Sequence, residues 1–418
     1  MIDYQKIEFK GKCIINFESK QIDSSNLNIT WTPGAGLSIK ARLEEADTSC
    51  KIGTKAKLTG HLTDKELTGM EFICEKATLI RIFTMENSKE SYGELYFHQF
   101  APFKILSAKA NICHYEYFLP NFIFDDEKQI GDSEDNEFKL GGFKFDYLRQ
   151  AITVQQIKEY KKISKTLKNF GVSAAITSIL KIPVKLIEDN PKFTDQLCLL
   201  ISALYGIDIR PQVCIVYDMN KNIAGIIINN HSTKPYHRKR TFINKLRTDN
   251  GWGVFLESSL PVAIHNFESY HLGQVCNQSV ESQRPMSLIS QTAIIWICLE
   301  NFTTNILHES GNYKKKQKSK TEQAQLDDKL NLVNKDIKVI PKSFTQKMKK
   351  EKWIKTIRNP LFHQGSGKLD QLLQIYYDLL TMTMLLLCGE CGYKGKIVYP
   401  KINHPDGQEI IDLNNILK

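Results

Sequence analysis

Hydrophobic and polar residues alternate along most of the first 150 positions. Ile29 and Trp31 have polar neighbours, and Leu37, Ile39 and Leu43 repeat the pattern after a Pro-Gly turn at residues 33–36. A period of two places successive side chains on opposite faces of a strand. We therefore predict that residues 1–150 form a β-rich, sandwich-like domain, with a distorted barrel as the alternative, and that the acidic residues 125–136 form an exposed loop.

The next hundred residues show a mixed pattern. Residues 158–168 predict a polar helix, and Thr194 is placed to cap a second helix that Gly206 ends. Residues 213–217 and 223–228 are two apolar runs separated by a short polar turn, which predicts a hairpin. Residues 151–252 are therefore interpreted as a mixed α/β extension or connector.

After residue 252 the hydrophobic period becomes that of helices. One helix is predicted after Pro285, a second through Leu326 and Leu330, and a third from Ser343, whose spacing to Gln346 resembles a capping box. The third is expected to end near Arg358, before Pro360. The last helix begins after Gly367 and is apolar on every face in its second half. The fold class is thus α+β and multidomain, with an all-α bundle at residues 253–400 and a tail at 401–418.

Composition narrows the class of protein. The chain has 418 residues, of which 42% are hydrophobic and 24% charged, so a folded protein is expected rather than a disordered one. The absence of an export signal and the ten scattered cysteines favour a cytoplasmic location with reduced thiols and no membrane partner. Cys388 and Cys391 resemble half of a zinc ribbon, but the nearest further ligand is His404 alone. We therefore predict no metal and no cofactor.

Positive charge is concentrated in one segment. Residues 311–370 contain 15 Lys and one Arg against six acidic residues, a net charge of +10 that equals that of the whole chain. Such segregation is typical of a surface that binds a polyanion. On a helical wheel Lys349, Lys352 and Lys355 fall away from the apolar side. We predict an RNA-backbone track formed by Lys347, Lys349, Lys350, Lys352 and Lys355, the alternative being an ordinary solvated face.

The motif Arg358-Asn359-x-x-x-His363 follows this lysine-rich helix. Arg binds phosphate through paired N–H donors, and His moves protons near neutral pH. Phosphodiester cleavage needs both abilities, and the 2′-OH of RNA supplies an internal nucleophile. Arg358, His363 and Asn359 are therefore the predicted catalytic residues, with Asn359 orienting the imidazole or the phosphate.

An R-N-x-x-x-H motif in a carboxy-terminal helical domain resembles the HEPN ribonucleases, and the Trp296-Ile-Cys-Leu-Glu300 segment fits their bundle. A large β-rich region before such a domain is similar to the ApeA-type proteins of bacterial anti-phage defence. The resemblance implies a homodimer whose two motifs form one composite site. It also implies cleavage without metal that leaves 2′,3′-cyclic phosphate and 5′-OH ends. The substrate would be transfer RNA or messenger RNA, and the amino-terminal region would sense a phage-derived trigger.

Two other functions fit the same residues. The bundle could dimerise and hold RNA or a partner without cutting it, in which case the lysines would be needed and His363 would not. Alternatively, the β-rich region could be the active part, as a glycan or ligand binder, although no carboxylate cluster or aromatic platform stands out in residues 1–150.

Overall fold

The computed structural model divides the chain into two compact units, each made of three segments. The first consists of Met1–Ile123, Ile152–Asp189 and Arg210–Tyr236, and the second of Phe124–Ala151, Asn190–Ile209 and His237–Lys418. The structure describes residues 5–416 except 34, 44–49, 65–66, 68–69, 88–89, 100–101, 108–109, 125–127, 130–140, 171–173, 230–240, 244–250, 311–321, 365–368 and 401–407. Most of the predicted acidic loop at 125–136 and the lysines at 314–316 therefore lie outside the described residues.

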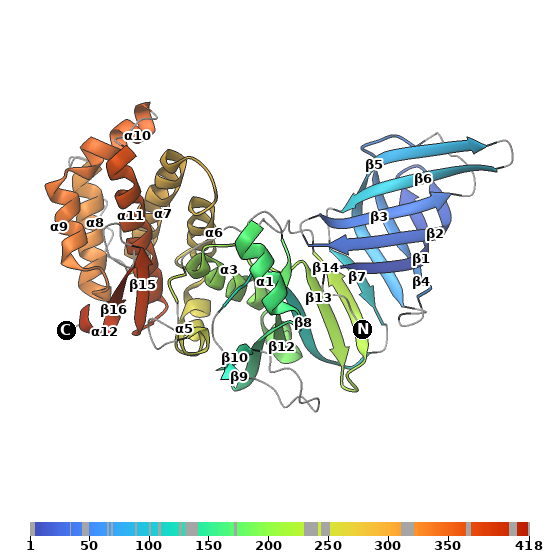
Figure 1. Ribbon diagram of the computed structural model, residues 1–418, viewed down its shortest axis with the longest axis horizontal. Coiled ribbons are helices and arrows are strands. Elements are labelled where there is room, and N and C mark those ends of the chain that lie inside the picture. Colours follow the sequence, from blue (N-terminus) through green and yellow to red (C-terminus); the bar gives the residue numbers. More distant parts are fainter. Residues whose placement is uncertain are drawn as a thin grey trace. The chain divides into compact units, whose positions relative to one another are not determined.

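A closed barrel of six antiparallel strands begins the first unit (Figure 1). Its strands follow the order β4-β1-β2-β3-β6-β5, and β5 pairs back with β4, which closes the barrel. The sandwich-like packing predicted for this region is therefore wrong, and the barrel alternative is confirmed. The strands are β1 (Ile7–Phe17), β2 (Gln21–Thr32), β3 (Gly36–Leu43), β4 (Lys55–Leu62), β5 (Glu71–Asn87) and β6 (Glu90–Gln99).

The alternating residues of the sequence fill this barrel. Leu27, Ile29 and Trp31 of β2 are each at most 1% exposed, as expected for the inward face of a strand. The paired strands β1 and β4 approach each other closely at two glycines. A Cβ atom at Gly60 would overlap the backbone oxygen of Lys12, and one at Gly11 would lie 2.5 Å from the backbone oxygen of His61. Glycine is therefore required there by the close approach of two backbones.

The sheet of the first unit continues beyond the barrel. From β5 the order is β7-β14-β13-β8-β12-β11. The predicted hairpin is confirmed as β13 and β14, with Val213 opposite Ile228. The indole N–H of Trp31 donates to Gln212 Oε1 at 3.2 Å and joins the barrel to this part. The elements are β7 (Phe103–Leu106), β8 (Ile112–Pro120), β11 (Gln150–Gln156), β12 (Ile176–Pro183), β13 (Val213–Asp218), β14 (Ile223–Ile228), α1 (Tyr160–Phe170) and α2 (Val184–Asp189).

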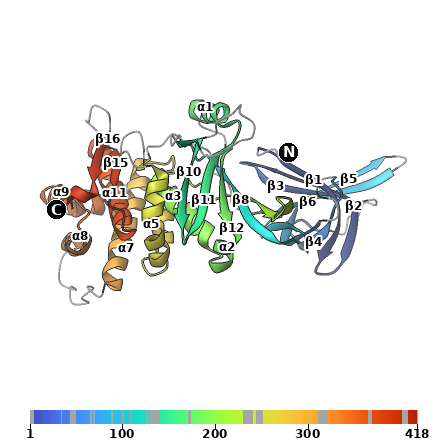
Figure 2. The same ribbon diagram turned by 90° about the horizontal axis from the view of Figure 1, so that it is seen from below.

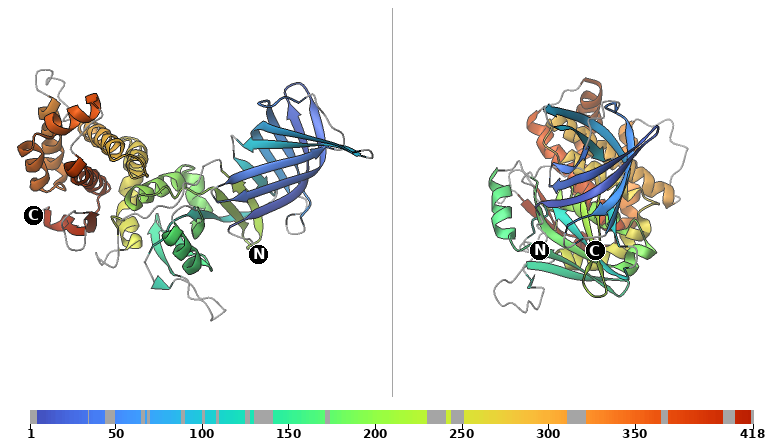
Figure 3. Two further views of the ribbon diagram at one scale, coloured as in Figure 1. Left: turned by 45° about the horizontal axis from the view of Figure 1, so that its top comes forward. Right: turned by 90° about the vertical axis from the view of Figure 1, so that its right-hand side faces the viewer.

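The second unit is mainly helical (Figures 2 and 3). Helices α6, α7 and α11 pack against one another, and α3 packs on α6 and α5. The chain contributes α3 (Phe193–Tyr205), α5 (Trp252–Asn266), α6 (Leu272–Ser282), α7 (Leu288–Glu309), α8 (Glu322–Ile337), α9 (Lys342–Lys350), the π-helical turn η1 (Ile354–Arg358), α10 (Asn359–Gln364), α11 (Leu369–Glu390) and α12 (Leu413–Ile416), with the strands β9 (Lys128–Gln129), β10 (Gly141–Tyr147), β15 (Lys396–Pro400) and β16 (Gln408–Asp412).

Some helix ends lie where the sequence predicts them, and others do not. Gly206 ends α3 with a φ of 83°, as predicted. Thr194 lies inside α3 rather than at its cap, because the helix begins at Phe193 after Lys192. The region predicted as a tail instead contributes β16, which pairs with β15.

Helix α11 forms part of the core of the second unit. Its second half was predicted to be buried, and every residue from Leu379 to Leu387 is at most 2% exposed. Within the described part of the chain, Gln371–Glu390 is long and apolar enough to cross a membrane by length and composition, and 78% of its apolar 18-residue segment is buried inside the structure. This burial is typical of a core helix.

The close approach at Gly60 predicts that Gly60→Ala lowers the free energy of unfolding by about 1–3 kcal/mol, because β1 and β4 must move apart to admit a methyl group. Ser38→Ala, at an exposed position of β3, is the control and should change stability by less than about 0.5 kcal/mol. The measurement is urea-induced unfolding of the full chain. Equal stability of the two variants would contradict the prediction.

Candidate functional site

The chain changes helical geometry immediately before the predicted catalytic motif. Helix α9 ends at Lys350, Lys352 has a positive φ of 49°, and residues 354–358 form the π-helical turn η1. The continuous helix predicted from Ser343 to Arg358 is therefore wrong. Its predicted capping box is also absent, since Pro341 occupies the cap position without a side-chain hydrogen bond. Single π-helical turns inside helical segments are frequent at functional sites.

Pro360 is the second residue of α10, which follows η1 without a gap. Proline has no backbone N–H and cannot extend the hydrogen-bond pattern of a preceding helix. The change of helical geometry from η1 to α10 therefore lies next to Pro360. The junction between η1 and α10 falls between Arg358 and Asn359, the first two residues of the motif.

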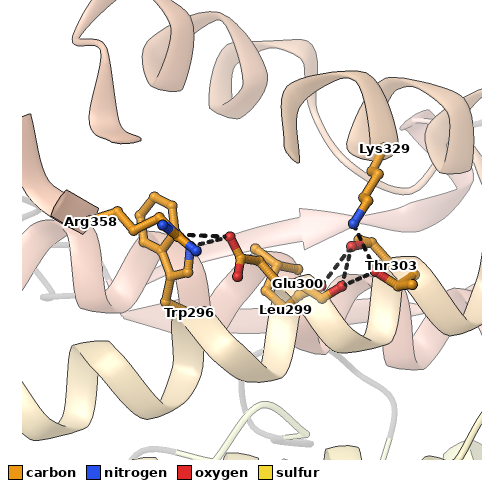
Figure 4. A network of polar contacts seen from close by, with 7 residues as sticks. Trp296, Leu299, Glu300, Thr303, Lys329 and Arg358 are labelled. Atoms are coloured by element: carbon orange, nitrogen blue, oxygen red, sulfur yellow. Dashed lines mark hydrogen bonds and ion pairs between the residues drawn. The ribbon is translucent and has the colours of Figure 1, made fainter. Parts of the chain in front are cut away.

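Arg358 is held by a carboxylate of helix α7 (Figure 4). Its Nε lies 3.1 Å from Glu300 Oε1, and the indole N–H of Trp296 donates to the same oxygen at 2.9 Å. Trp296 and Glu300 are four residues apart, so they share one face of α7. Trp296 is fully buried, whereas the side chains of Arg358 and Glu300 are 21% and 27% exposed. The buried indole thus fixes the carboxylate that receives the guanidinium.

The guanidinium of Arg358 also contacts an aromatic ring. Its Cζ lies 5.5 Å from the centroid of Phe362 in α10, a distance typical of a cation–π interaction. Phe362 is 38% exposed and precedes His363 directly. Arg358 is therefore positioned by α7 on one side and by α10 on the other.

A second cation lies near Glu300. Lys329 of α8 donates to Thr304 Oγ1 at 3.0 Å. Burial lowers the pKa of Lys329, and the negative charge of Glu300 acts in the opposite direction. In Figure 4, Arg358 and Lys329 approach α7 at successive turns. The carboxylate of Glu300 therefore experiences positive charge from two neighbouring elements.

The other two motif residues lie in α10. Asn359 Oδ1 is buried and has no hydrogen-bond partner among the described residues. His363 belongs to α10 by its backbone, and its side chain lies outside the described residues. Asn359 and His363 are four residues apart in α10, so about one helical turn separates their backbones. The backbone thus brings all three predicted catalytic residues to one short junction.

The predicted lysine track divides into two groups. Lys349, Lys350 and Lys352 are exposed, and Lys355 lies in η1 with its side chain outside the described residues. Lys347 differs, because its Nζ lies 2.7 Å from Asp378 Oδ2 and 5.7 Å from the ring centroid of Trp353. Lys347 therefore joins α9 to α11.

Sequence reasoning missed Glu300 and Lys329 as site residues. In the sequence, Glu300 belongs only to the Trp296–Glu300 segment that resembles the HEPN bundle. The available signal was a carboxylate one turn after a tryptophan on the buried side of a long apolar helix, a position that favours an ionic partner. The signal for Lys329 was weaker: it is a lysine next to the buried position Leu330, and such a position favours a partner for its charge.

Cys388 and Cys391 are both fully buried at the end of α11. Burial raises the pKa of Cys388 to about 12 and raises that of Cys391 as well. A metal ligand must be the thiolate, which such burial disfavours. Among the described residues no group of three His, Cys, Asp or Glu is arranged to hold a metal ion, and His404 lies outside them.

No protein-family model, curated protein or solved structure matches this chain.

The buried carboxyl of Asp378, paired with the half-buried Lys347, predicts a pH effect on stability. Burial raises the pKa of Asp378 above its ordinary value of 3.8, although Lys347 and Gln374 oppose the shift. The folded state therefore favours the protonated carboxyl, and ionisation weakens the fold as pH rises from about 4 through the folded pKa. The variant Asp378→Asn does not lose stability in this way, since asparagine stays neutral at every pH. We expect its melting temperature to rise relative to wild type between pH 4 and pH 7.

The control for this comparison is Asp146→Asn, at an exposed position of β10. Its melting temperature should stay at a constant offset from wild type across the same range. Thermal unfolding followed by circular dichroism measures all three proteins. A constant offset for Asp378→Asn would contradict the prediction.

Proposed function

We propose that this chain is an endoribonuclease of HEPN type that cuts RNA without a metal ion. The observation that carries the proposal is the junction at which Arg358 is held by Glu300, next to Asn359 and to the backbone of His363. A guanidinium, an amide and an imidazole on one junction supply charge stabilisation, orientation and proton transfer for phosphodiester cleavage.

The reaction uses the nucleophile of the substrate. The 2′-oxygen attacks the adjacent phosphorus and loses its proton to a base, while the bond from phosphorus to the 5′-oxygen breaks and that oxygen takes up a proton. The products are a 2′,3′-cyclic phosphate and a 5′-OH. Arg358 offsets the charge that builds on the phosphoryl oxygens, and His363 performs one of the two proton transfers. The unpaired Oδ1 of Asn359 accepts a hydrogen bond from the imidazole or from the 2′-OH.

A second copy of the chain would supply the other proton transfer. One imidazole cannot act as base and acid in the same step, whereas two facing motifs provide both. Ile297 of α7, Phe362 of α10 and Leu373 of α11 are each 38% exposed. They belong to the elements that hold or adjoin the motif. We place the homodimer interface on these three side chains, because burying them removes apolar surface from water beside the catalytic residues.

The RNA backbone would approach along Lys349, Lys350, Lys352 and Lys355. Lys347 is left out of this track, since its ammonium group serves the pair with Asp378. Lysines contact phosphates without reading bases, so the track predicts affinity that depends on salt and tolerates different sequences.

The β-rich unit would restrain the nuclease in the cytoplasm until a phage-derived trigger binds, as in anti-phage defence. An unrestrained ribonuclease that cuts transfer RNA or messenger RNA would harm its host. The predicted bundle 253–400 does not contain all of the helical unit, because α3 and β10 pack on α5 and α6. Restraint is therefore better tested by substitutions in the full chain than by truncation.

Cleavage of total cellular RNA in EDTA tests the proposed activity. We expect products with cyclic-phosphate ends, and a loss of about 10²–10⁴-fold in rate for His363→Ala, which removes the proton-transfer group. His265→Ala, at an exposed position of α5, should keep wild-type activity. RNA binding without cleavage, both alone and in an extract of infected cells, would support the non-catalytic alternative.

Ile297→Asp tests the proposed interface. A carboxylate introduced among apolar side chains loses its hydration on association, so we expect a monomer with little ribonuclease activity. Met219→Asp, at a 66% exposed position of the first unit, is the matched control and should remain dimeric. Sedimentation velocity gives the oligomeric state. If Ile297→Asp formed a dimer with the affinity of wild type, the proposed interface on Ile297, Phe362 and Leu373 would be wrong.

A further inference from the structure

Helix α1 (Tyr160–Phe170) of the first unit carries a face of exposed lysines. Lys158, directly before the helix, is exposed, and so are Lys161, Lys162 and Lys165 within it. Spacings of three, four and seven residues place these side chains on one side of a helix. Residues 158–168 contain five lysines and one acidic residue, Glu159, which gives a net charge of +4.

The opposite side of α1 is already packed. Tyr160, Ser164 and Leu167 are buried, with exposed fractions of 9%, 9% and 1%, and α1 contacts β12 of the same unit. Figure 2 shows α1 along one side of the strands. An amphipathic helix that binds a membrane must insert its apolar face into the lipid. Since that face of α1 is occupied, only the charged face is available to a partner.

The lysines of α1 differ from many others in this unit. Lys40, Lys57 and Lys181 each lie within 4.0 Å of a glutamate. No such pair is found for Lys161, Lys162 or Lys165 among the described residues. Residues 1–123 of the unit contain fifteen basic and fifteen acidic residues. The excess on α1 is therefore local and is not the background charge of the unit.

We propose that this lysine face of α1 is a second binding surface for the RNA backbone, in addition to the track before the motif. The inference rests on the proposed function in that it takes the same RNA as ligand. Lys161 and Lys165 are one helical turn apart, so they contact neighbouring positions along a strand. Because ammonium groups bind phosphates as point charges, the surface holds RNA without selecting its sequence. Its role is to increase affinity for long RNA.

The test is RNA binding by the full chain in a His363→Ala background, which prevents cleavage. The variant Lys161→Gln, Lys162→Gln, Lys165→Gln removes three charges from α1. The matched control removes three from exposed lysines of the same unit, Lys51→Gln, Lys55→Gln and Lys76→Gln. The dissociation constant of a single-stranded RNA oligonucleotide is measured against salt concentration, and the melting temperature of each protein verifies that it is folded.

Each phosphate contact contributes about 0.7 to the salt dependence for a single strand. In a plot of log K against the logarithm of the salt concentration, where K is the association constant for RNA, we therefore expect the slope of the α1 variant to be about 2 smaller in magnitude than that of wild type. Its affinity should fall about 10- to 100-fold at 0.1 M salt. The control should keep the wild-type slope. In the active background, the α1 variant should raise KM for long RNA and leave kcat unchanged.

An unchanged slope in the α1 variant, or an equal loss in the control, would overturn the proposal. Loss of binding to anionic vesicles or to polyglutamate, with RNA binding intact, would overturn it in favour of a membrane or an acidic protein. The nuclease proposal fails separately. Binding that depends on α1, without any cleavage that depends on His363, would support this surface and contradict the ribonuclease.

Discussion

The pair formed by Arg358 and Glu300 is the interaction on which the candidate site depends. It joins the π-helical turn η1 to α7, one of the two longest helices of the second unit. The carboxylate accepts hydrogen bonds from both Trp296 and Arg358, so its position is set by a buried ring. An ion pair this exposed adds little to stability, but it fixes the direction of a long side chain. The pair therefore contributes more to positioning than to folding.

The same pair constrains how the site could bind a phosphate. A phosphate that approaches Arg358 meets a guanidinium that already contacts a carboxylate at Nε. The substrate must bind beside Glu300 or displace it. Lys329 is a second cation near this carboxylate. Its ammonium group donates to Thr304 Oγ1 one turn further along α7, and the negative charge of Glu300 opposes the lowering of its pKa by burial.

Local patterns in the sequence predict the elements well, and long-range contacts escape them. The alternation around Ile29 and Trp31 identifies strands because it reflects one buried face. Whether a sheet closes depends on β4 meeting β5, a pairing that no local pattern contains. The interruption at Lys352 is likewise absent from the local pattern. A basic, regular segment favours one continuous helix, whereas Lys352 has a positive φ and the buried residues Trp353 and Ile357 follow it. Lys347 is predicted to belong to the surface track because its partner, Asp378, lies 31 residues further along the chain and no local pattern links the two.

The organisation of the chain bears on how the proposed nuclease is controlled. Neither unit is continuous in sequence, since each is assembled from three segments and the chain passes between them repeatedly. A sensor linked to a nuclease by one flexible connector can be removed without consequence for the fold. Here α3 lies between two segments of the first unit in sequence and packs on α6, which packs in turn on α7, the helix of Glu300. No single cut in the sequence therefore separates the two units, and the proposed sensor cannot be removed without also removing chain on both sides of α3.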